Sequence, residues 1–139
     1  MNRQVRSIAL AALVAACGSP TPTTAPASPD APIQLRQAPA DLGCDAMGVP
    51  YREVMFRIDP AALEHVSAVT DTGAILRTFW SAGFRGGPAA DKAVVGPAGE
   101  VVAGDGDVLA IPQGAWPRLH GYFVCPSPDA LYILAADPV

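Results

Sequence analysis

Side chains able to bind a ligand concentrate in two short segments, "FWSAGFRGG" at residues 79–87 and "AWPRLHGY" at residues 115–122. Aromatic faces beside guanidinium groups suit contacts with sugars, peptides or anionic ligands, and such residues often dominate binding energy at interfaces. A packing role is the alternative, in which the two tryptophans plug the ends of a small barrel and arginine stems cover their edges. The candidate ligand-binding residues are Trp80, Phe84, Arg85, Trp116, Arg118, His120 and Tyr122.

Catalytic chemistry has few candidate residues. A serine nucleophile needs a base, and the chain has only His65 and His120, with no "GxSxG" elbow. The enzymatic alternative is a small hydrolase that uses His120 together with an acid. Asp105 and Asp107 in "GDGD" indicate a turn rather than a calcium loop, because no closing bidentate glutamate follows. We therefore expect a non-enzymatic protein without a metal or another cofactor.

The first 16 residues have the composition of a signal peptide. Arg3 and Arg6 lie in a basic stretch without acids, and residues 8–16 form an apolar run of nine residues. A helix that crosses a bilayer needs about 20 apolar residues, so the run is too short for a permanent span. Residues 1–16 are therefore predicted to direct export.

The stretch "LVAAC", residues 13–17, resembles the lipobox of bacterial lipoproteins, in which small residues precede a cysteine that becomes the mature N-terminus. The resemblance implies that Cys17 carries a diacylglyceryl thioether and an amide-linked acyl chain. Two or more acyl chains hold a protein stably at a membrane. Val14 stands where leucine is commoner, and ordinary signal cleavage with secretion is the alternative. By this resemblance the protein is extracytoplasmic and anchored to the cell membrane.

Lipidation of Cys17 leaves two further cysteines, Cys44 and Cys125. An exported protein meets an oxidising compartment, where such a pair tends to form a disulfide. A zinc site is the alternative, but it needs about four ligands at short spacing, and only His120 lies near either cysteine in sequence. A disulfide between Cys44 and Cys125 is the prediction.

Residues 17–43 are rich in proline, alanine, threonine and serine and show no helical or alternating period, which is typical of an extended, disordered tether. Ile33 and Leu35 mark the point at which this tether begins to dock onto the domain that follows. The formal charge of −4 offers no excess of basic residues to neutralise phosphates, so we expect no nucleic-acid partner.

Residues 44–139 are predicted to form one all-β domain. "EVMFRI", residues 53–58, alternates as a half-buried strand does, and "HVSAVTDTGAILRTFW", residues 65–80, indicates two strands joined by a turn at "DTG". "LHGYFVC" and "ALYILAA" indicate a closing hairpin around "PSPD", and Pro60 suits the start of a single helical turn. The expected fold is a small antiparallel barrel or sandwich of about five to seven short strands.

One internal segment, "VVGPAGEVVAGDGDVLAI" at residues 94–111, resembles the strand–turn–strand of small β-barrel modules in bacterial lipoproteins, including OB-like ones. The resemblance implies two consecutive barrel strands. The matching residues are Gly99, Val101, Val102, Ala103, Gly106 and Asp107.

Together these features predict a lipid-anchored exported protein whose domain binds a ligand or another component of the cell envelope without catalysis. The membrane is the partner through Cys17, and an envelope protein, a glycan or a small anionic ligand is the expected contact of the aromatic segments. A hydrolase using His120 and a purely structural spacer are the alternatives.

Overall fold

The structure is a computed structural model that describes residues 28–44 and 48–137. The predicted signal peptide, the predicted lipidation site Cys17 and the first part of the predicted tether lie outside the described residues. Among those residues the only helix is the 3₁₀ turn η1 (Ala89–Asp91), and no helix is long and apolar enough to cross a membrane. The predicted all-β class is confirmed.

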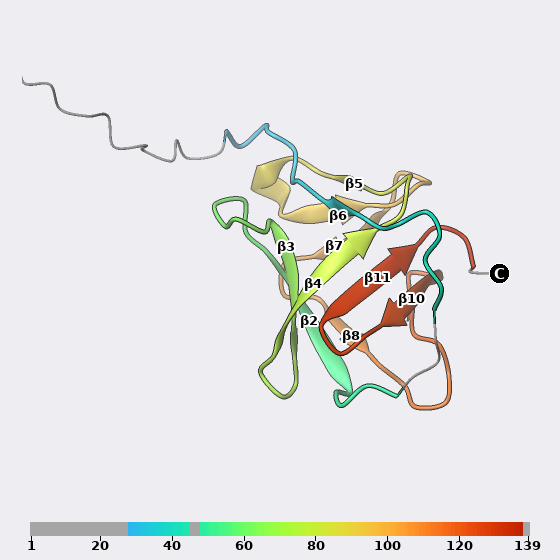
Figure 1. The fold of residues 1–139 in the computed structure, drawn as a ribbon. Helices are drawn as coiled ribbons and strands as arrows, with labels where there is room; N and C mark the ends of the chain where they lie inside the picture. Colours follow the sequence, from blue (N-terminus) through green and yellow to red (C-terminus); the bar gives the residue numbers. More distant parts are fainter. Residues whose placement is uncertain (1–27, 45–47, 138–139) are drawn as a thin grey trace, which may run out of the picture.

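A three-stranded meander opens the main sheet (Figure 1): β2 (Glu53–Ile58), β3 (Val66–Thr70) and β4 (Ile75–Trp80) pair antiparallel. The alternation in the sequence sets the faces, because successive side chains of a strand point to opposite sides. Val54, Phe56 and Ile58 point inward and are 0–1% exposed. Gly73, at φ +88°, forms the predicted turn between β3 and β4.

The sheet then continues with a strand from the far end of the sequence. β11 (Ala130–Leu134) pairs with β4 in parallel, and β10 (Tyr122–Pro126) pairs antiparallel with β11. The sequence had indicated antiparallel pairing throughout, whereas the pairing of β4 with β11 is parallel. Parallel neighbours need a long connection, and here residues 81–129 supply it.

Short strands end the sheet on both sides. β9 (Arg118–Leu119) pairs with β10, and β8 (Val108–Ala110) pairs with β2, which gives the order β8-β2-β3-β4-β11-β10-β9. The sheet curls into a barrel (Figure 1), which stays open because its two end strands, β8 and β9, do not pair with each other. We call this opening the seam.

A second sheet of three strands covers one end of the barrel: β5 (Arg85–Gly86), β6 (Ala93–Val95) and β7 (Val101–Gly104). Val94 and Val102 are fully buried and join the barrel core. The segment 94–111 is thus divided between two sheets, because β6 and β7 belong to the small sheet and β8 belongs to the barrel. The expectation of two consecutive barrel strands there is wrong.

The turn "GDGD" makes this division possible. The carboxylate of Asp105 accepts a hydrogen bond from the backbone N–H of Ile58 at 2.8 Å, and that of Asp107 accepts one from Gly104 at 2.7 Å. Gly106 takes a φ of +87°, which glycine adopts without steric cost. Both aspartates therefore cap backbone groups, as expected for a turn.

Residues 29–44 form a strap along the outside of the barrel. Within it, β1 (Arg36–Gln37) pairs in parallel with β4, and the backbone N–H of Ile33 donates to the carbonyl of Gly87 at 2.9 Å. Ile33 is 2% exposed and belongs to the main core. The packed part of the chain therefore begins before Cys44, within the segment that the sequence had indicated as tether.

Glycine at position 86 lets the backbone of the strap pass close to β5 at Ile33. A Cβ atom placed on Gly86 would lie 1.8 Å from the carbonyl oxygen of Ile33, far inside van der Waals contact. Within the "GFRGG" loop, Gly86 thus serves close backbone packing.

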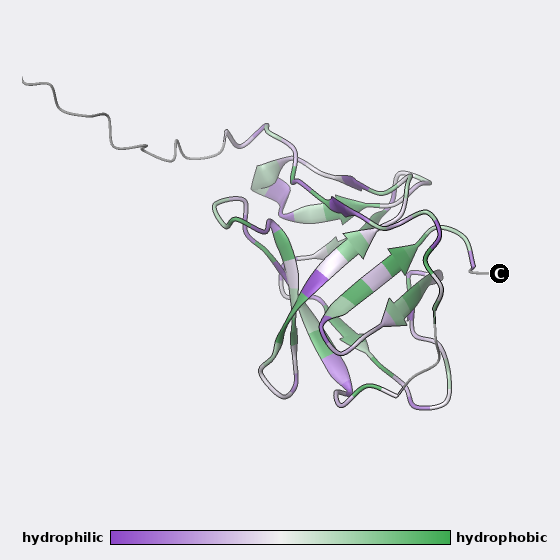
Figure 2. Ribbon diagram, in the orientation of Figure 1, coloured by the Kyte–Doolittle hydropathy of each residue, from purple (hydrophilic) through white to green (hydrophobic). Residues whose placement is uncertain are grey.

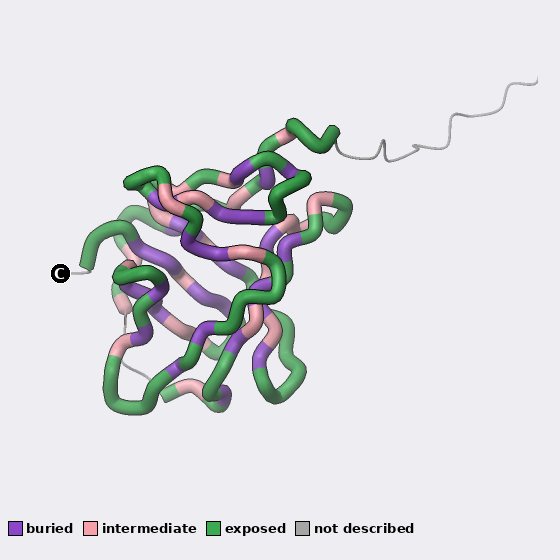
Figure 3. The backbone as a smooth tube through the Cα atoms, turned by 180° about the vertical axis from the view of Figure 1, so that it is seen from behind, coloured by how far each residue is buried: buried purple, intermediate pink, exposed green. Residues whose placement is uncertain are grey.

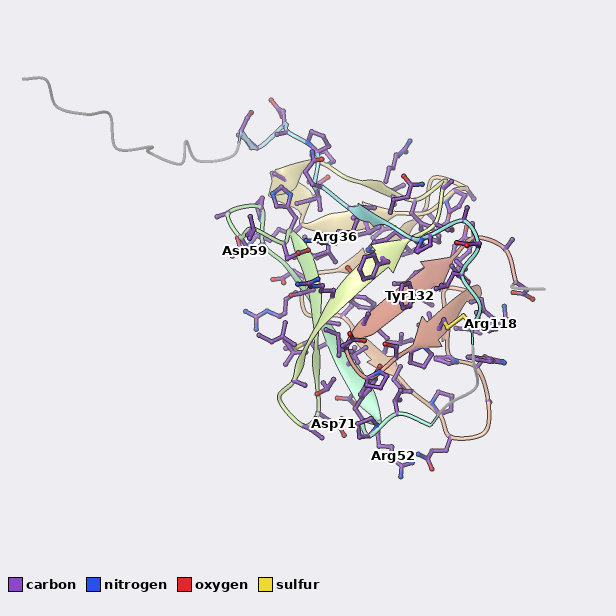
Figure 4. The ribbon with its side chains drawn as sticks, in the orientation of Figure 1. Arg36, Arg52, Asp59, Asp71, Arg118 and Tyr132 are labelled. Atoms are coloured by element: carbon purple, nitrogen blue, oxygen red, sulfur yellow. A yellow bond between two sulfur atoms is a disulfide. The ribbon has the colours of Figure 1, made fainter. Side chains whose placement is uncertain are left out.

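The strap ends at the predicted disulfide, which the structure confirms. The Cα atoms of Cys44 and Cys125 are 5.8 Å apart, and the bond closes a loop across 81 positions (Figure 4). Beneath the strap a second apolar cluster covers the outer side of β10 and β11, with Ala38, Phe123 and Leu134 buried in it. The barrel thus has apolar packing inside and, on this side, outside as well.

Hydropathy and burial follow the strands. Hydrophobic positions predominate along β11 in Figure 2, and buried positions lie mainly on strands while the loops are exposed in Figure 3. The predicted helical turn after Asp59 is instead a turn without helix, in which the Asp59 carboxylate accepts a hydrogen bond from the N–H of Ala61.

Candidate functional site

A cavity of about 290 Å³ lies at the end of the barrel opposite the small sheet. Arg52 and Asp71 mark this end in Figure 4. Three pieces of chain form its walls: the 111–117 loop between β8 and β9, the segment 48–51 before β2, and the end of β10. We call it the seam cavity. Its lining residues are Gly48, Val49, Tyr51, Ile111, Pro112, Gln113, Gly114, Ala115, Trp116, Pro117 and Pro126.

Prolines and one glycine shape the loop of the seam cavity. Pro112 and Pro117 fix φ near −65° at both ends of the loop, and Gly114 turns the chain with a φ of +76°. Ile111 is 5% exposed, and its N–H donates to the carbonyl of Arg52 at 2.8 Å. The loop therefore starts from a buried, hydrogen-bonded anchor.

Tyr51 supports the cavity from inside the barrel. Its side chain is 2% exposed, and the hydroxyl donates a hydrogen bond to the carbonyl oxygen of Ser127 at 2.7 Å. Burial raises the pKa of Tyr51 to about 12, with a smaller contribution from the nearby charge of Asp129. The phenol is thus held neutral and fixed in place.

Trp116 provides the aromatic wall of the seam cavity. Its indole is half-buried and packs against Phe123, with ring centroids 4.8 Å apart and planes inclined by 44°. The guanidinium carbon of Arg118 lies 5.2 Å from the centroid of Phe123, and Arg118 also pairs with Asp137 at 2.8 Å. Arg118 thus acts on the ring that supports Trp116 and does not itself line the cavity.

Among the described residues that line the seam cavity none is charged, and Gln113 is the only one of them with a side-chain amide. An uncharged, mainly apolar wall favours neutral ligands, because an ion would lose its hydration there without a partner. In the described part of the lining there is also no acid, histidine or thiol for proton transfer or nucleophilic attack.

The first aromatic segment lies elsewhere. Trp80 is 1% exposed and packs in the core against Phe56 and Phe84, and its indole N–H donates to the hydroxyl of Thr78 at 3.0 Å. This is the packing role that the sequence had left open as the alternative for Trp80. Phe84 in turn packs against Tyr122, with the two ring centroids 5.0 Å apart.

The two segments therefore meet through Phe84 and Tyr122 rather than through the tryptophans. The hydroxyl of Tyr122 donates to the carboxylate of Glu100, which holds the pKa of Glu100 below its ordinary value and raises that of Tyr122. Arg85, which follows Phe84 directly, is exposed on β5 and does not line the seam cavity.

The two histidines lie apart from the seam cavity. His120 is exposed in the turn between β9 and β10 with a φ of +48°, and none of the hydrogen bonds among the described residues involves its ring. His65 accepts a hydrogen bond from the backbone N–H of Gln34 and so helps to hold the strap. In the described part of the chain no group of three or more His, Cys, Asp or Glu residues could hold a metal ion.

Sequence reasoning found Trp116 but missed Tyr51, Gln113 and the prolines around them. The string "IPQGAWP", residues 111–117, carries the available signal, because two prolines and a glycine bracket the tryptophan. Gly48 and Val49 could not be found in this way, since only the fold brings them to the same place.

Two further hollows lie on the surface. One, of about 430 Å³, borders β3, β4 and the 59–65 loop and carries charges of both signs, and the other, of about 620 Å³, separates the strap from residues 134–137. Neither contains an aromatic side chain. The seam cavity is therefore the candidate site.

Comparison with known proteins adds no relative: no family model, no curated protein and no solved structure matches this chain.

Proposed function

We propose that this protein is a lipid-anchored binding module of the cell envelope that holds an uncharged group in the seam cavity. The observation that carries the proposal is the half-buried indole of Trp116 in a wall whose described residues carry no charge. Aromatic and apolar walls with a few convergent polar groups are typical of small-ligand sites.

The size of the seam cavity limits what it holds. Its volume of about 290 Å³ lies at the lower end of the roughly 300–1,000 Å³ that ligand pockets span. It therefore takes one ring or one side chain of a larger ligand, such as a sugar ring or an apolar amino-acid side chain. A small anion fits less well, because Arg85 and Arg118 lie outside the lining and Arg118 already pairs with Asp137.

Export and anchoring rest on the N-terminal sequence. The signal-like residues 1–16 and Cys17 in the lipobox-like "LVAAC" support attachment to a membrane from the extracytoplasmic side. The disulfide between Cys44 and Cys125 supports the same location, because such bonds persist in oxidising compartments. The OB-like resemblance of residues 94–111 contributes nothing to this proposal.

Binding is preferred to the alternatives on geometry. A hydrolase needs His120 beside a serine or a carboxylate in a pocket, and His120 lies in an exposed turn outside the seam cavity. A spacer needs no concave aromatic surface, whereas Trp116 lines one.

The test of binding is a thermal-shift screen of the full chain carrying Cys17→Ser, with its disulfide intact, against neutral glycans, peptidoglycan fragments and uncharged peptides. A ligand at 100 times its Kd adds about 2.7 kcal/mol of apparent stability and shifts Tm by several degrees. Trp116→Ala should abolish the shift, whereas Arg85→Ala, an exposed control, should retain it. A shift that survives Trp116→Ala would move the site away from the seam cavity.

The test of anchoring compares cell fractions. The unmodified chain should sediment with membranes and yield an acylated peptide beginning at Cys17 by mass spectrometry. Cys17→Ser should release the chain to the soluble fraction. Membrane attachment that persists in Cys17→Ser would contradict the lipid anchor.

A further inference from the structure

We propose that the ligand of the seam cavity is an extended, uncharged peptide segment of a partner protein, which adds as a strand to the free edge of β8. The proposal rests on the proposed function and names the ligand class. Strand addition uses main-chain hydrogen bonds for affinity and pockets for alternate side chains for specificity.

The register of β8 shows which backbone groups are free. Ile111 donates to the carbonyl of Arg52, and Phe56 donates to the carbonyl of Asp107, so these are the hydrogen-bonded pairs of the β2–β8 ladder. Antiparallel ladders alternate between hydrogen-bonded and non-hydrogen-bonded pairs. Leu109 therefore bonds to β2, and the N–H and C=O groups of Val108 and Ala110 point away from it.

These groups lie on an open edge. β8 is the last strand on its side of the sheet, and both Val108 and Ala110 are exposed. Two residues in strand conformation present donors and acceptors at the spacing of a β-ladder, which the backbone of another strand matches and a glycan does not. This match is the reason to commit to a peptide.

An apolar row of side chains reaches this edge. On the outer face, Val108 pairs with Met55, Met55 with Val69, and Val69 with Ile75 across four neighbouring strands. Val108 and Ile75 are 56% and 74% exposed. Because directly opposed side chains stabilise one another across strands, a peptide residue beside Val108 with a β-branched side chain would extend this row.

The seam cavity continues from the same edge. Ile111 and Pro112, which follow Ala110 directly, line it, and Trp116 forms its aromatic wall. A peptide on β8 therefore has its next side chain within reach of the cavity. Because no described lining residue is charged, that side chain is expected to be neutral. The expected segment is an extended run of β-branched residues, followed by one residue whose ring or aliphatic side chain enters the cavity.

The experiment measures binding of a peptide in which six alternating valine and threonine residues precede one tryptophan, with its N-terminus acetylated and its C-terminus amidated so that it carries no charge. Amide hydrogen exchange of the full chain carrying Cys17→Ser is the structural readout. In the free protein the amide of Leu109 should exchange slowly, and those of Val108 and Ala110 should exchange fast. Binding should slow exchange at Val108 and Ala110. The same peptide with N-methyl groups on the amides that face β8 should bind at least about tenfold more weakly.

A matched pair of variants places the contact on the edge. Val108→Pro removes a donor that β2 does not use, and proline is tolerated at strand edges. It should weaken binding about tenfold or more while exchange at Leu109 stays slow. Val108→Thr keeps both the donor and the β-branched shape and should bind as the unmodified chain does. Equal affinity of the N-methylated and unmodified peptides would overturn the proposal, whether or not Val108→Pro folds.

Further outcomes separate this proposal from the proposed function. If Trp116→Ala loses the peptide while N-methylation and Val108→Pro have no effect, the cavity binds a ligand and strand addition is wrong. If Val108→Pro loses the peptide while Trp116→Ala has no effect, the edge captures strands and the cavity is not the site. A concentration-dependent dimer of the chain without peptide, abolished by Val108→Pro, would identify a second copy as the occupant and overturn the partner-protein assignment.

Discussion

Two outer faces of one barrel differ in what covers them. On the face of β10 and β11, the strap buries Phe123 and Leu134 and the disulfide closes it. On the face of β8, β2, β3 and β4, the apolar row from Val108 to Ile75 has no such cover among the described residues. We call these the covered face and the open face.

The difference shows how a small domain divides its apolar surface. The second apolar cluster and the disulfide add stability to that of the main core. The open face buries less apolar surface than the covered face and so contributes less to the free energy of unfolding. Removing the cover should therefore cost far more than changing the open face.

The largest effect is expected from the disulfide. Replacing both Cys44 and Cys125 by serine should lower the free energy of unfolding by about 4 kcal/mol, because the unfolded chain is no longer closed into a long loop. Urea denaturation measures the loss. The variant should also bind a hydrophobic dye, as the strap releases the covered face. A change below about 1 kcal/mol would show that the strap holds without its bond.

The next largest loss of stability is expected where the strap passes close to Gly86. Gly86→Val should lower the free energy of unfolding by about 3 kcal/mol, because its Cβ would collide with the carbonyl oxygen of Ile33. Gly43→Val is the control, since nothing lies within 4 Å of a Cβ there. Thermal denaturation compares the two, and equal losses would contradict close packing at Gly86.

A direct comparison of the two faces gives a smaller effect. Leu134→Ala removes a side chain that is 8% exposed on the covered face and should cost about 2 kcal/mol. Ile75→Ala removes one that is 74% exposed on the open face and should cost less than about 0.5 kcal/mol. Similar losses in urea denaturation would mean that the open face is packed in solution.

The smallest effect is expected from the ion pair that ties the strap to the 59–65 loop. The Arg36 guanidinium hydrogen-bonds the Glu64 carboxylate and holds the pKa of Glu64 below its ordinary value. The folded state therefore favours the charged carboxylate, so this contribution is present above the ordinary pKa and is lost as pH falls through the lowered one.

Arg36→Gln should remove that part of the acid dependence of Tm, because Glu64 then titrates near its ordinary pKa. Arg85→Gln is the matched control, since Arg85 is exposed and forms no ion pair among the described residues. The shift should be smaller than that of Leu134→Ala, because an exposed pair is screened by water. Identical pH profiles of Tm for Arg36→Gln and the unmodified chain would exclude this role.

Local patterns in the sequence determined much of the barrel. The alternation of Val54, Phe56 and Ile58 specifies which side of β2 faces the core, since side chains of a strand alternate by geometry alone. Turn residues such as Gly73 specify where strands end, because few other residues adopt a positive φ. The predicted export signal, together with two cysteines beyond Cys17, was enough to predict the pairing of Cys44 with Cys125.

The tertiary structure alone decided how distant parts meet. Nothing local distinguishes the parallel pairing of β4 with β11 from an antiparallel one, because side chains alternate along a strand in the same way whichever direction its neighbour runs. The docking of Ile33 onto Gly87 and the junction of Gly48 with Trp116 likewise join residues far apart in the chain. Patterns over a few residues specify local conformation, whereas strand order and cavities arise from contacts that close long loops.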